Sequence, residues 1–420
     1  MGCGSSHTVH SQIITHDSSK CIYDSWDLQD ELVNGNFIKV HKATEKGSGR
    51  QAVVKIYGMC EASDDISLQR MNAMTHKAGV HEARIRSLIG QHQNVGALYE
   101  IFRGHKKYFV VMEACECHVL SHLAAMPGVN EGDLARVFGQ MLSGLAHIHS
   151  KAIAHRNISA ESFRLGLDGS KLCDFSCAAV VPDSGCLHGS FGVAPYMSPE
   201  MINDDIHGTK TDIWSLGVVC YLMLYGKFPY MSPDRTIEAT TQSIASGVPP
   251  PSFRACRPSC ETTFMAKIFV TALLNRNVAE RVSAKQALND GFLKLKMYNT
   301  CDLQPILQAG ELLRLEFDDK VVEQITSSVE DDNEYDSEIP SSDYPELSQD
   351  SLAYRIFRTN TSMHAKIHDA SSEACASTCA DSVEFASGSC QTSSRQSVKT
   401  VNEILQDLDC GLDVDYGLEF

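Results

Sequence analysis

Hydrophobic and polar positions alternate over short segments in the first quarter of the chain. Segments rich in β-branched and aromatic residues, separated by turn residues such as Gly47 and Gly49, are typical of strands. Between two such segments, Glu82, Ile85 and Leu88 have helical spacing. This region is therefore predicted to be a small sheet with one helix. The strands are predicted at 37–43, 52–57, 98–102 and 108–112.

Beyond residue 113 the apolar residues are spaced three or four apart, as in amphipathic helices. One such face extends from Leu134 to Ile148. The apolar run from Ile213 to Tyr225 is shorter than a membrane span, so it predicts a buried helix. The pattern fades after residue 293, except for an acidic amphipathic stretch at 312–325 that we expect to pack on the helical region or to bind a partner. The second region is therefore predicted to be mostly helical.

Acidic residues are concentrated at the C-terminal end. Residues 301–420 hold 25 of the 53 Asp and Glu residues but only 7 of the 36 Lys and Arg residues. The preceding part, with 28 acidic and 29 basic residues, is nearly neutral. Neither part offers the basic surface that nucleic acid would need, so we expect no nucleic-acid partner. The Ser-, Asp- and Glu-rich composition of the C-terminal end is typical of disorder.

The 16 cysteines do not predict disulfides, because the start of the chain lacks the apolar core and cleavage pattern of a secretory signal. No C-x-x-C pair occurs, and the segment from Cys115 to His118 has no second pair of ligands at zinc-finger spacing. We therefore expect reduced thiols. Residues 331–342 lack the Gly and the terminal Glu of a calcium-binding loop, so no calcium-sensor domain is predicted.

The first six residues match a lipidation signal. Met1-Gly2-Cys3-Gly4-Ser5-Ser6 fits the pattern for myristoylation of Gly2. A single myristoyl chain anchors weakly, and Cys3 offers a site for a second chain through palmitoylation. The sequence therefore predicts a lipid-anchored protein on the cytoplasmic face of a membrane.

A series of short motifs follows one order along the chain. The motifs are Ala52-Val53-Val54-Lys55, His155-Arg156-Asn157, Asp174-Phe175-Ser176, Ser198-Pro199-Glu200, Asp212-Ile213-Trp214-Ser215-Leu216-Gly217 and Arg281. In order and spacing they resemble the protein kinase superfamily, and more loosely its calcium/calmodulin-dependent serine/threonine branch. The resemblance implies an α+β fold of two lobes. The implied parts are a lipid-anchored disordered segment at 1–26, a β-rich N-lobe at 27–113, a helical C-lobe at 114–295 and a largely disordered acidic tail at 296–420.

The resemblance also assigns roles to residues that match the family pattern. It places Lys55 at the phosphates of a nucleotide, with Glu82 as its ion-pair partner, and it makes Asp174 a ligand for magnesium. ATP and magnesium are thus the implied cofactors. The remaining nucleotide-binding positions are Gly35, Val40, Ala52, Met112 and Glu113, and the structural positions are His155, Arg156, Glu200, Asp212 and Arg281. The resemblance makes Arg281 the ion-pair partner of Glu200.

The chain departs from the family where phosphoryl transfer takes place. Asn157 stands at the position of the catalytic Asp, Ser159 at that of a Lys, and Ser162 at that of an Asn that holds magnesium. An amide cannot accept the proton of a substrate hydroxyl, and a hydroxyl carries no cation to screen the phosphoryl group. The glycine-rich loop is also changed, with Val33 and Ile38 at its outer glycine positions.

These departures favour a pseudokinase that acts as a scaffold or allosteric regulator with protein partners in signalling. The alternative is an active serine/threonine kinase in which Lys55 and Asp174 hold the nucleotide and Asn157 only orients the acceptor.

Overall fold

In the computed structural model, the described residues are 14–16, 21–34, 38–58, 66–103, 107–203, 206–232, 235–257, 260–295, 298 and 300–330. Among these residues, no helix is long and apolar enough to cross a membrane. Gly2, Cys3 and Gly35 lie outside the described residues, as does the acidic tail beyond residue 330.

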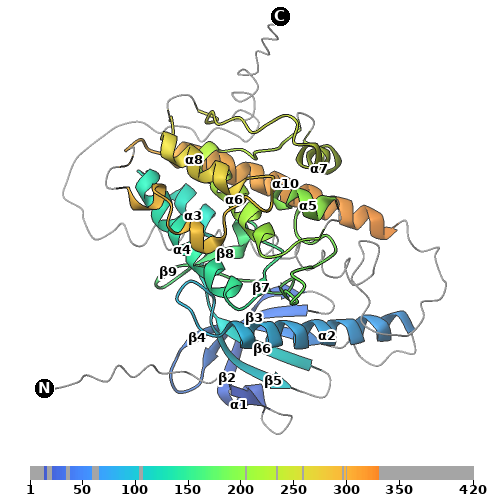
Figure 1. The fold of residues 1–420 in the computed structure, drawn as a ribbon. Helices are drawn as coiled ribbons and strands as arrows, with labels where there is room; N and C mark the ends of the chain where they lie inside the picture. The colour runs from blue at the N-terminus through green and yellow to red at the C-terminus, as the bar shows by residue number, and fades with distance from the viewer. Residues whose placement is uncertain are drawn as a thin grey trace, which may run out of the picture. The chain divides into compact units, whose positions relative to one another are not determined.

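A six-stranded sheet forms the first lobe, in the order β1-β5-β6-β4-β3-β2. All neighbouring strands are antiparallel except β1, which pairs parallel with β5. A long helix, α2 (Ile66–Ile89), packs on β4 and β6 (Figure 1). The four predicted strands correspond to β3, β4, β5 and β6, and the predicted helix is α2, whereas β1 lies in the segment predicted to be disordered. The strands are β1 Ile14–His16, β2 Trp26–Asn34, β3 Ile38–Glu45, β4 Gln51–Gly58, β5 Leu98–Arg103 and β6 Lys107–Glu113.

The folded lobe begins earlier than the boundary predicted at residue 27. Trp26 is fully buried beneath the sheet, where it stacks on Tyr99 with ring centroids 6.3 Å apart. Ile22, in the short helix α1 (Ile22–Ser25), is buried in the same cluster. Hydrophobic periodicity could not show this, because these are isolated apolar residues among polar ones. Strand β2 was missed for a related reason, since it is an edge strand with several acidic residues.

The second lobe is built around α6 (Lys210–Tyr225), in which every residue from Thr211 to Tyr225 is buried. The predicted buried helix at 213–225 is therefore present. Its other helices of seven residues or more are α3 Val119–Ala125, α4 Glu131–His149, α7 Ile237–Ser246, α8 Phe264–Leu273 and α10 Gln304–Glu330. The short elements are β7 Ile153–Ala154, η1 Ala160–Ser162, β8 Phe163–Gly166, β9 Gly169–Leu172, β10 Ala179–Val180, η2 Ala194–Tyr196, α5 Pro199–Ile202, α9 Ala284–Ala287 and η3 Phe292–Lys294.

Helix α10 extends the second lobe past the boundary predicted at residue 295. It packs against α3 and α6, and Figure 1 shows it in orange beside them. Leu303, Ile306, Leu307 and Phe317 are buried in the core of the lobe. Leu313 and Phe317 thus meet the expectation of packing on the helical region for residues 312–317 of the acidic amphipathic stretch. The acidic residues around these apolar positions made the segment resemble a tail.

Candidate active site

A buried carboxylate joins the sheet to α2. Lys55, on β4, places its Nζ 3.0 Å from Oε2 of Glu82, on α2, so the expected ion pair is present. The same carboxylate accepts a hydrogen bond from the hydroxyl of Tyr57, and its Oε1 lies 2.9 Å from Nε of Arg86. Three donors from two elements therefore hold Glu82. Arg86 and Tyr57 were not predicted, because family motifs mark neither position.

The charges of this cluster are fixed at neutral pH. Burial would raise the pKa of Glu82, but the cations of Lys55 and Arg86 lower it to about 2. Burial would lower the pKa of Lys55, yet Glu82, Tyr57 and Asp174 raise it well above its usual value. Lys55 is therefore a cation and Glu82 an anion, although both side chains are buried.

Asp174 faces the cation from the second lobe. Its Oδ1 lies 3.6 Å from Nζ of Lys55 and accepts a hydrogen bond of 2.7 Å from the hydroxyl of Ser176. Asp174 has a φ of 57°, in the left-handed region that side chains seldom adopt. The predicted magnesium ligand Asp174 therefore lies beside Lys55, on a strained backbone. One of its carboxylate oxygens is hydrogen-bonded to Ser176.

Asp212 on α6 holds the loop that starts at His155 in place. Asp212, fully buried on α6, accepts the backbone N–H groups of His155 and Arg156, each at 2.8 Å. Nε2 of His149 lies 2.8 Å from the same carboxylate. Burial raises the pKa of Asp212, and the contacts with His149 and His155 lower it to a net value below its usual range. Asp212 therefore has the structural role that the resemblance implied.

Aromatic and cationic contacts connect this loop to α2. The ring of His155 meets that of Phe175 edge-on, with centroids 5.1 Å apart. On the other side of the contact, the guanidinium of Arg86 lies 4.8 Å from the Phe175 ring. Nε2 of His81 lies 2.8 Å from the carbonyl oxygen of Ala178. Helix α2 is thus fixed to both lobes, with Glu82 held against Lys55.

The three substituted positions of the loop form contacts within the loop itself. Ser162 donates its hydroxyl to the carbonyl oxygen of Asn157 at 2.7 Å and accepts the backbone N–H of Ser159 at 3.0 Å. The hydroxyl of Ser159 accepts the N–H of Glu161 at 3.2 Å and so caps η1. Asn157 is buried, and its Oδ1 has no hydrogen-bond partner among the described residues. The serines thus support the turn, whereas the amide oxygen of Asn157 is left unpaired.

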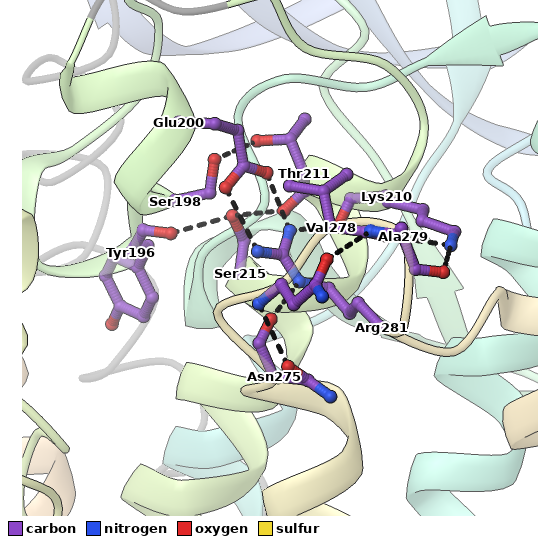
Figure 2. Close-up of polar contacts among 11 residues, drawn as sticks. Tyr196, Ser198, Glu200, Lys210, Thr211, Ser215, Asn275, Val278, Ala279 and Arg281 are labelled. Carbon is purple, nitrogen blue, oxygen red and sulfur yellow. Dashed lines mark hydrogen bonds and ion pairs between the residues drawn. The ribbon is translucent and has the colours of Figure 1, made fainter.

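A second ion pair lies where the resemblance placed only structural residues. Arg281 contacts both oxygens of Glu200, at 2.6 and 3.0 Å, and also donates to backbone carbonyls of Asn275 and Lys210. Figure 2 shows this guanidinium at the centre of the cluster. It lies 5.1 Å from the ring of Trp214. The expected partners are therefore in contact, and the buried guanidinium makes four hydrogen bonds.

The predicted nucleotide-binding residues of the sheet lie on adjoining strands. Val40 pairs with Lys55 between β3 and β4, and Ala52 pairs with Glu113 between β4 and β6, next to Met112. Val40 and Ala52 are buried.

Glu113 also crosses to the second lobe. Its Oε1 lies 3.2 Å from Nζ of Lys171 on β9, and its Oε2 accepts the N–H of Ala97 at 3.0 Å. The contact of Lys171 with Glu113 was not predicted, because their separation in the sequence does not show that the two residues meet.

Helix α10 reaches the loop as well. Arg314, almost fully buried, forms an ion pair with Glu161 in η1 and a second one of 2.7 Å with Glu311. Glu311 in turn accepts a hydrogen bond of 2.8 Å from Ser121 on α3. This link from the C-terminal helix to the loop was not predicted from the sequence.

Comparisons with known proteins agree with the two-lobed arrangement. The family model "Protein kinase domain" matches residues 26–293. The chain is 28% identical over 271 residues to calcium/calmodulin-dependent protein kinase type II of Caenorhabditis elegans, which covers 63% of this chain and 35% of that protein. It is 26% identical over 276 residues to serine/threonine-protein kinase STE20 of Candida glabrata, covering 64% of this chain and 29% of that protein.

The chain thus spans about a third of the length of these two relatives. Among solved structures, the twitchin kinase region from Caenorhabditis elegans has a TM-score of 0.63 at 18% identity. That match covers 74% of this chain and 53% of the twitchin chain, and it shows a shared fold.

Proposed function

The chain belongs to the protein kinase domain family, and from this premise we propose that it acts as a pseudokinase. In this proposal it serves as a scaffold or allosteric regulator in signalling, together with protein partners. The observation that carries the proposal is the state of the loop from Asn157 to Ser162. The hydroxyls of Ser159 and Ser162 hydrogen-bond within the loop. The contacts that shape the lobe around the loop are retained.

The chemistry of the loop argues against efficient phosphoryl transfer. Asn157 offers an amide where the reaction needs a general base, and loss of such a base costs about 10²–10⁴-fold in rate. Ser159 offers no cation, so stabilisation of the transferring phosphoryl group is lost as well. The two losses act on one step and need not multiply. Neither Asn157 nor Ser159 can therefore perform the task of the residue that it replaces.

The residues that remain fit a magnesium nucleotide only in part. Lys55 supplies a cation for the phosphates, and Asp174 supplies a carboxylate for the metal. Bound magnesium would neutralise phosphate charge and orient the phosphoryl group. Ser162, at the position of the second metal ligand, directs its hydroxyl to the carbonyl oxygen of Asn157. We therefore propose nucleotide binding through Lys55 and Asp174, without efficient turnover.

A specific observation supports the alternative of an active serine/threonine kinase. The unpaired Oδ1 of Asn157 is a hydrogen-bond acceptor that could orient a substrate hydroxyl, with Lys55 and Asp174 holding ATP. The test is phosphate transfer from ATP to basic serine- and threonine-containing peptides. The proposal expects no transfer by the purified chain above that of the Lys55→Met and Asp174→Ala variants. Transfer that both substitutions abolish would establish the alternative instead.

Nucleotide binding is tested separately by thermal unfolding with and without magnesium and ATP. Ligand at about 100 times its dissociation constant adds about 2.7 kcal/mol to the free energy of unfolding, which raises Tm by a few degrees. We expect a magnesium-dependent rise for the unsubstituted chain and a smaller one for Asp174→Ala. Equal Tm values with and without millimolar nucleotide would remove nucleotide binding from the proposal.

Membrane attachment rests on the first residues of the sequence. We propose myristoylation of Gly2 and palmitoylation of Cys3, which together supply the two acyl chains that stable anchoring requires. Gly2→Ala should move the protein from the membrane fraction to the soluble fraction of expressing cells, and Cys3→Ser should weaken the attachment. If Gly2→Ala leaves the protein in the membrane fraction, the anchor is not myristate.

A further inference from the structure

Two cysteines that are far apart in the sequence lie close together beside the candidate active site. Cys115 follows β6, in the segment that links the sheet to α3, and Cys173 directly precedes Asp174. Their sulfur atoms are 3.9 Å apart. Both residues are partly exposed. Gly96 leaves room for the pair because it has no side chain. A Cβ at this position would lie only 3.1 Å from Sγ of Cys173.

The backbone on both sides of the pair is held in place. Next to Cys115, the N–H of Glu116 donates to the carbonyl of Leu165 on β8 at 2.9 Å, and Leu165 donates back to Cys117 at 2.8 Å. The N–H of Cys173 donates to the carbonyl of Ser162 at 2.8 Å. Backbone hydrogen bonds therefore hold Cys115 next to the segment that contacts β8, and Cys173 next to the end of β9, which pairs with β8.

A disulfide is within reach of this geometry. Bonded sulfurs are about 2.05 Å apart, so the two atoms must approach by about 1.9 Å. Rotation of the two side chains can supply much of this movement. The bond would join residues 58 positions apart in sequence and would tie the segment between the lobes to the residue before Asp174.

We propose that Cys115 and Cys173 form a redox-active dithiol, which a hydroperoxide converts into an intramolecular disulfide. One thiol attacks hydrogen peroxide, so that a sulfenic acid forms and one water molecule leaves. The second thiol then attacks the sulfenic sulfur, the S–S bond forms and a second water molecule leaves. Both sulfurs are oxidised, both peroxide oxygens are reduced, and the two thiol protons end in water. The proposal does not depend on whether the chain transfers phosphate.

The test is a disulfide map of the full chain after treatment with hydrogen peroxide. Reduced protein is oxidised, the remaining thiols are alkylated, and the protein is digested without reductant for mass spectrometry. We expect a linked peptide pair containing Cys115 and Cys173, lighter by two hydrogens than the separate peptides and released by dithiothreitol. Cys115→Ser should abolish the link, whereas Cys186→Ser, which removes a partly exposed thiol elsewhere, should retain it.

The unsubstituted chain alone can decide the question, so a variant that fails to fold does not obstruct the test. If alkylation in denaturant after oxidation modifies Cys115 and Cys173 to the same extent as the reduced Cys220, the proposal is overturned. A map in which Cys115 links to Cys117, or in which only Cys260 and Cys301 are joined, would also overturn it.

Discussion

Two clusters within the second lobe differ in what they retain of the family pattern. Around Arg281 and Asp212, every expected partner is in place, with buried charges paired at 2.6 to 3.0 Å. In the loop from Asn157 to Ser162, the residues that would perform phosphoryl transfer have been replaced, and two of the replacements hydrogen-bond to the loop backbone. Contacts that determine shape are thus kept while groups that perform chemistry are absent. This comparison supports our proposal that the chain retains the fold rather than the reaction.

The largest effect is expected from breaking the structural cluster. Arg281→Ala leaves Glu200 buried without its partner, and loss of one member of a buried pair costs about 3–5 kcal/mol of unfolding free energy. Urea unfolding measures this loss. Arg136→Ala is the matched control, because Arg136 pairs with Asp133 at the surface and should cost less than about 1 kcal/mol. Equal losses for the two variants would show that the cluster around Arg281 is not a structural centre.

The buried ion pair of Lys55 and Glu82 should make the free energy of unfolding depend on pH. The pKa of Glu82 is about 2 in the folded chain, against 4.5 ordinarily. Its contribution is therefore complete above pH 4.5 and is lost as the pH falls toward 2, for a total of about 3 kcal/mol.

Urea unfolding at pH 7, 4.5 and 3 should show this loss in the unsubstituted chain. Glu82→Gln should lower stability at pH 7 and show a smaller fall between pH 4.5 and 3. If the two chains show parallel falls, other carboxylates cause the acid sensitivity.

The link from α10 to the loop should have an intermediate effect. Arg314→Ala leaves Glu161 and Glu311 without their buried cation, and we expect a loss of about 2–3 kcal/mol. Hydrogen exchange should show faster exchange in α10 and in η1 together. Arg235→Ala, which removes a half-exposed pair with Glu316 on the same helix, should have a smaller effect and leave η1 unchanged. Faster exchange in α10 alone would mean that the helix does not support the loop.

The smallest effect on stability is expected within the loop. Ser159→Ala removes the cap of η1, which costs about 1 kcal/mol, and should not change any phosphate transfer. Thermal unfolding and a transfer assay on the same sample measure both quantities. A change in transfer would show that the hydroxyl takes part in chemistry.

Much of the fold could be predicted from the sequence, because strands and buried helices have a hydrophobic period and the motifs occur in order. The ion pair of Lys55 with Glu82 and that of Arg281 with Glu200 were predicted from motif positions and are present. The hydrophobic periodicity did not include Trp26, because it is an isolated aromatic residue. In the fold its ring stacks on Tyr99.

Contacts between distant charges could not be predicted in the same way. Lys171 meets Glu113 and Arg314 reaches Glu161, yet each side chain alone resembles a solvated surface charge. Burial of the surrounding segment decides whether such a charge finds a partner, and an acidic composition hides that burial in α10. The substituted positions could be identified from the sequence, but their inward hydrogen bonds could not.

The most direct test restores the missing groups to the retained scaffold. The variant Asn157→Asp, Ser159→Lys, Ser162→Asn is compared with the unsubstituted chain for phosphate transfer from ATP to a basic peptide. The account predicts that the substituted chain transfers phosphate at least about 10²-fold faster, since base and cation return to an intact lobe. Equal rates, with transfer in both chains abolished by Asp174→Ala, would contradict it, because the loop as it stands would then be sufficient for catalysis.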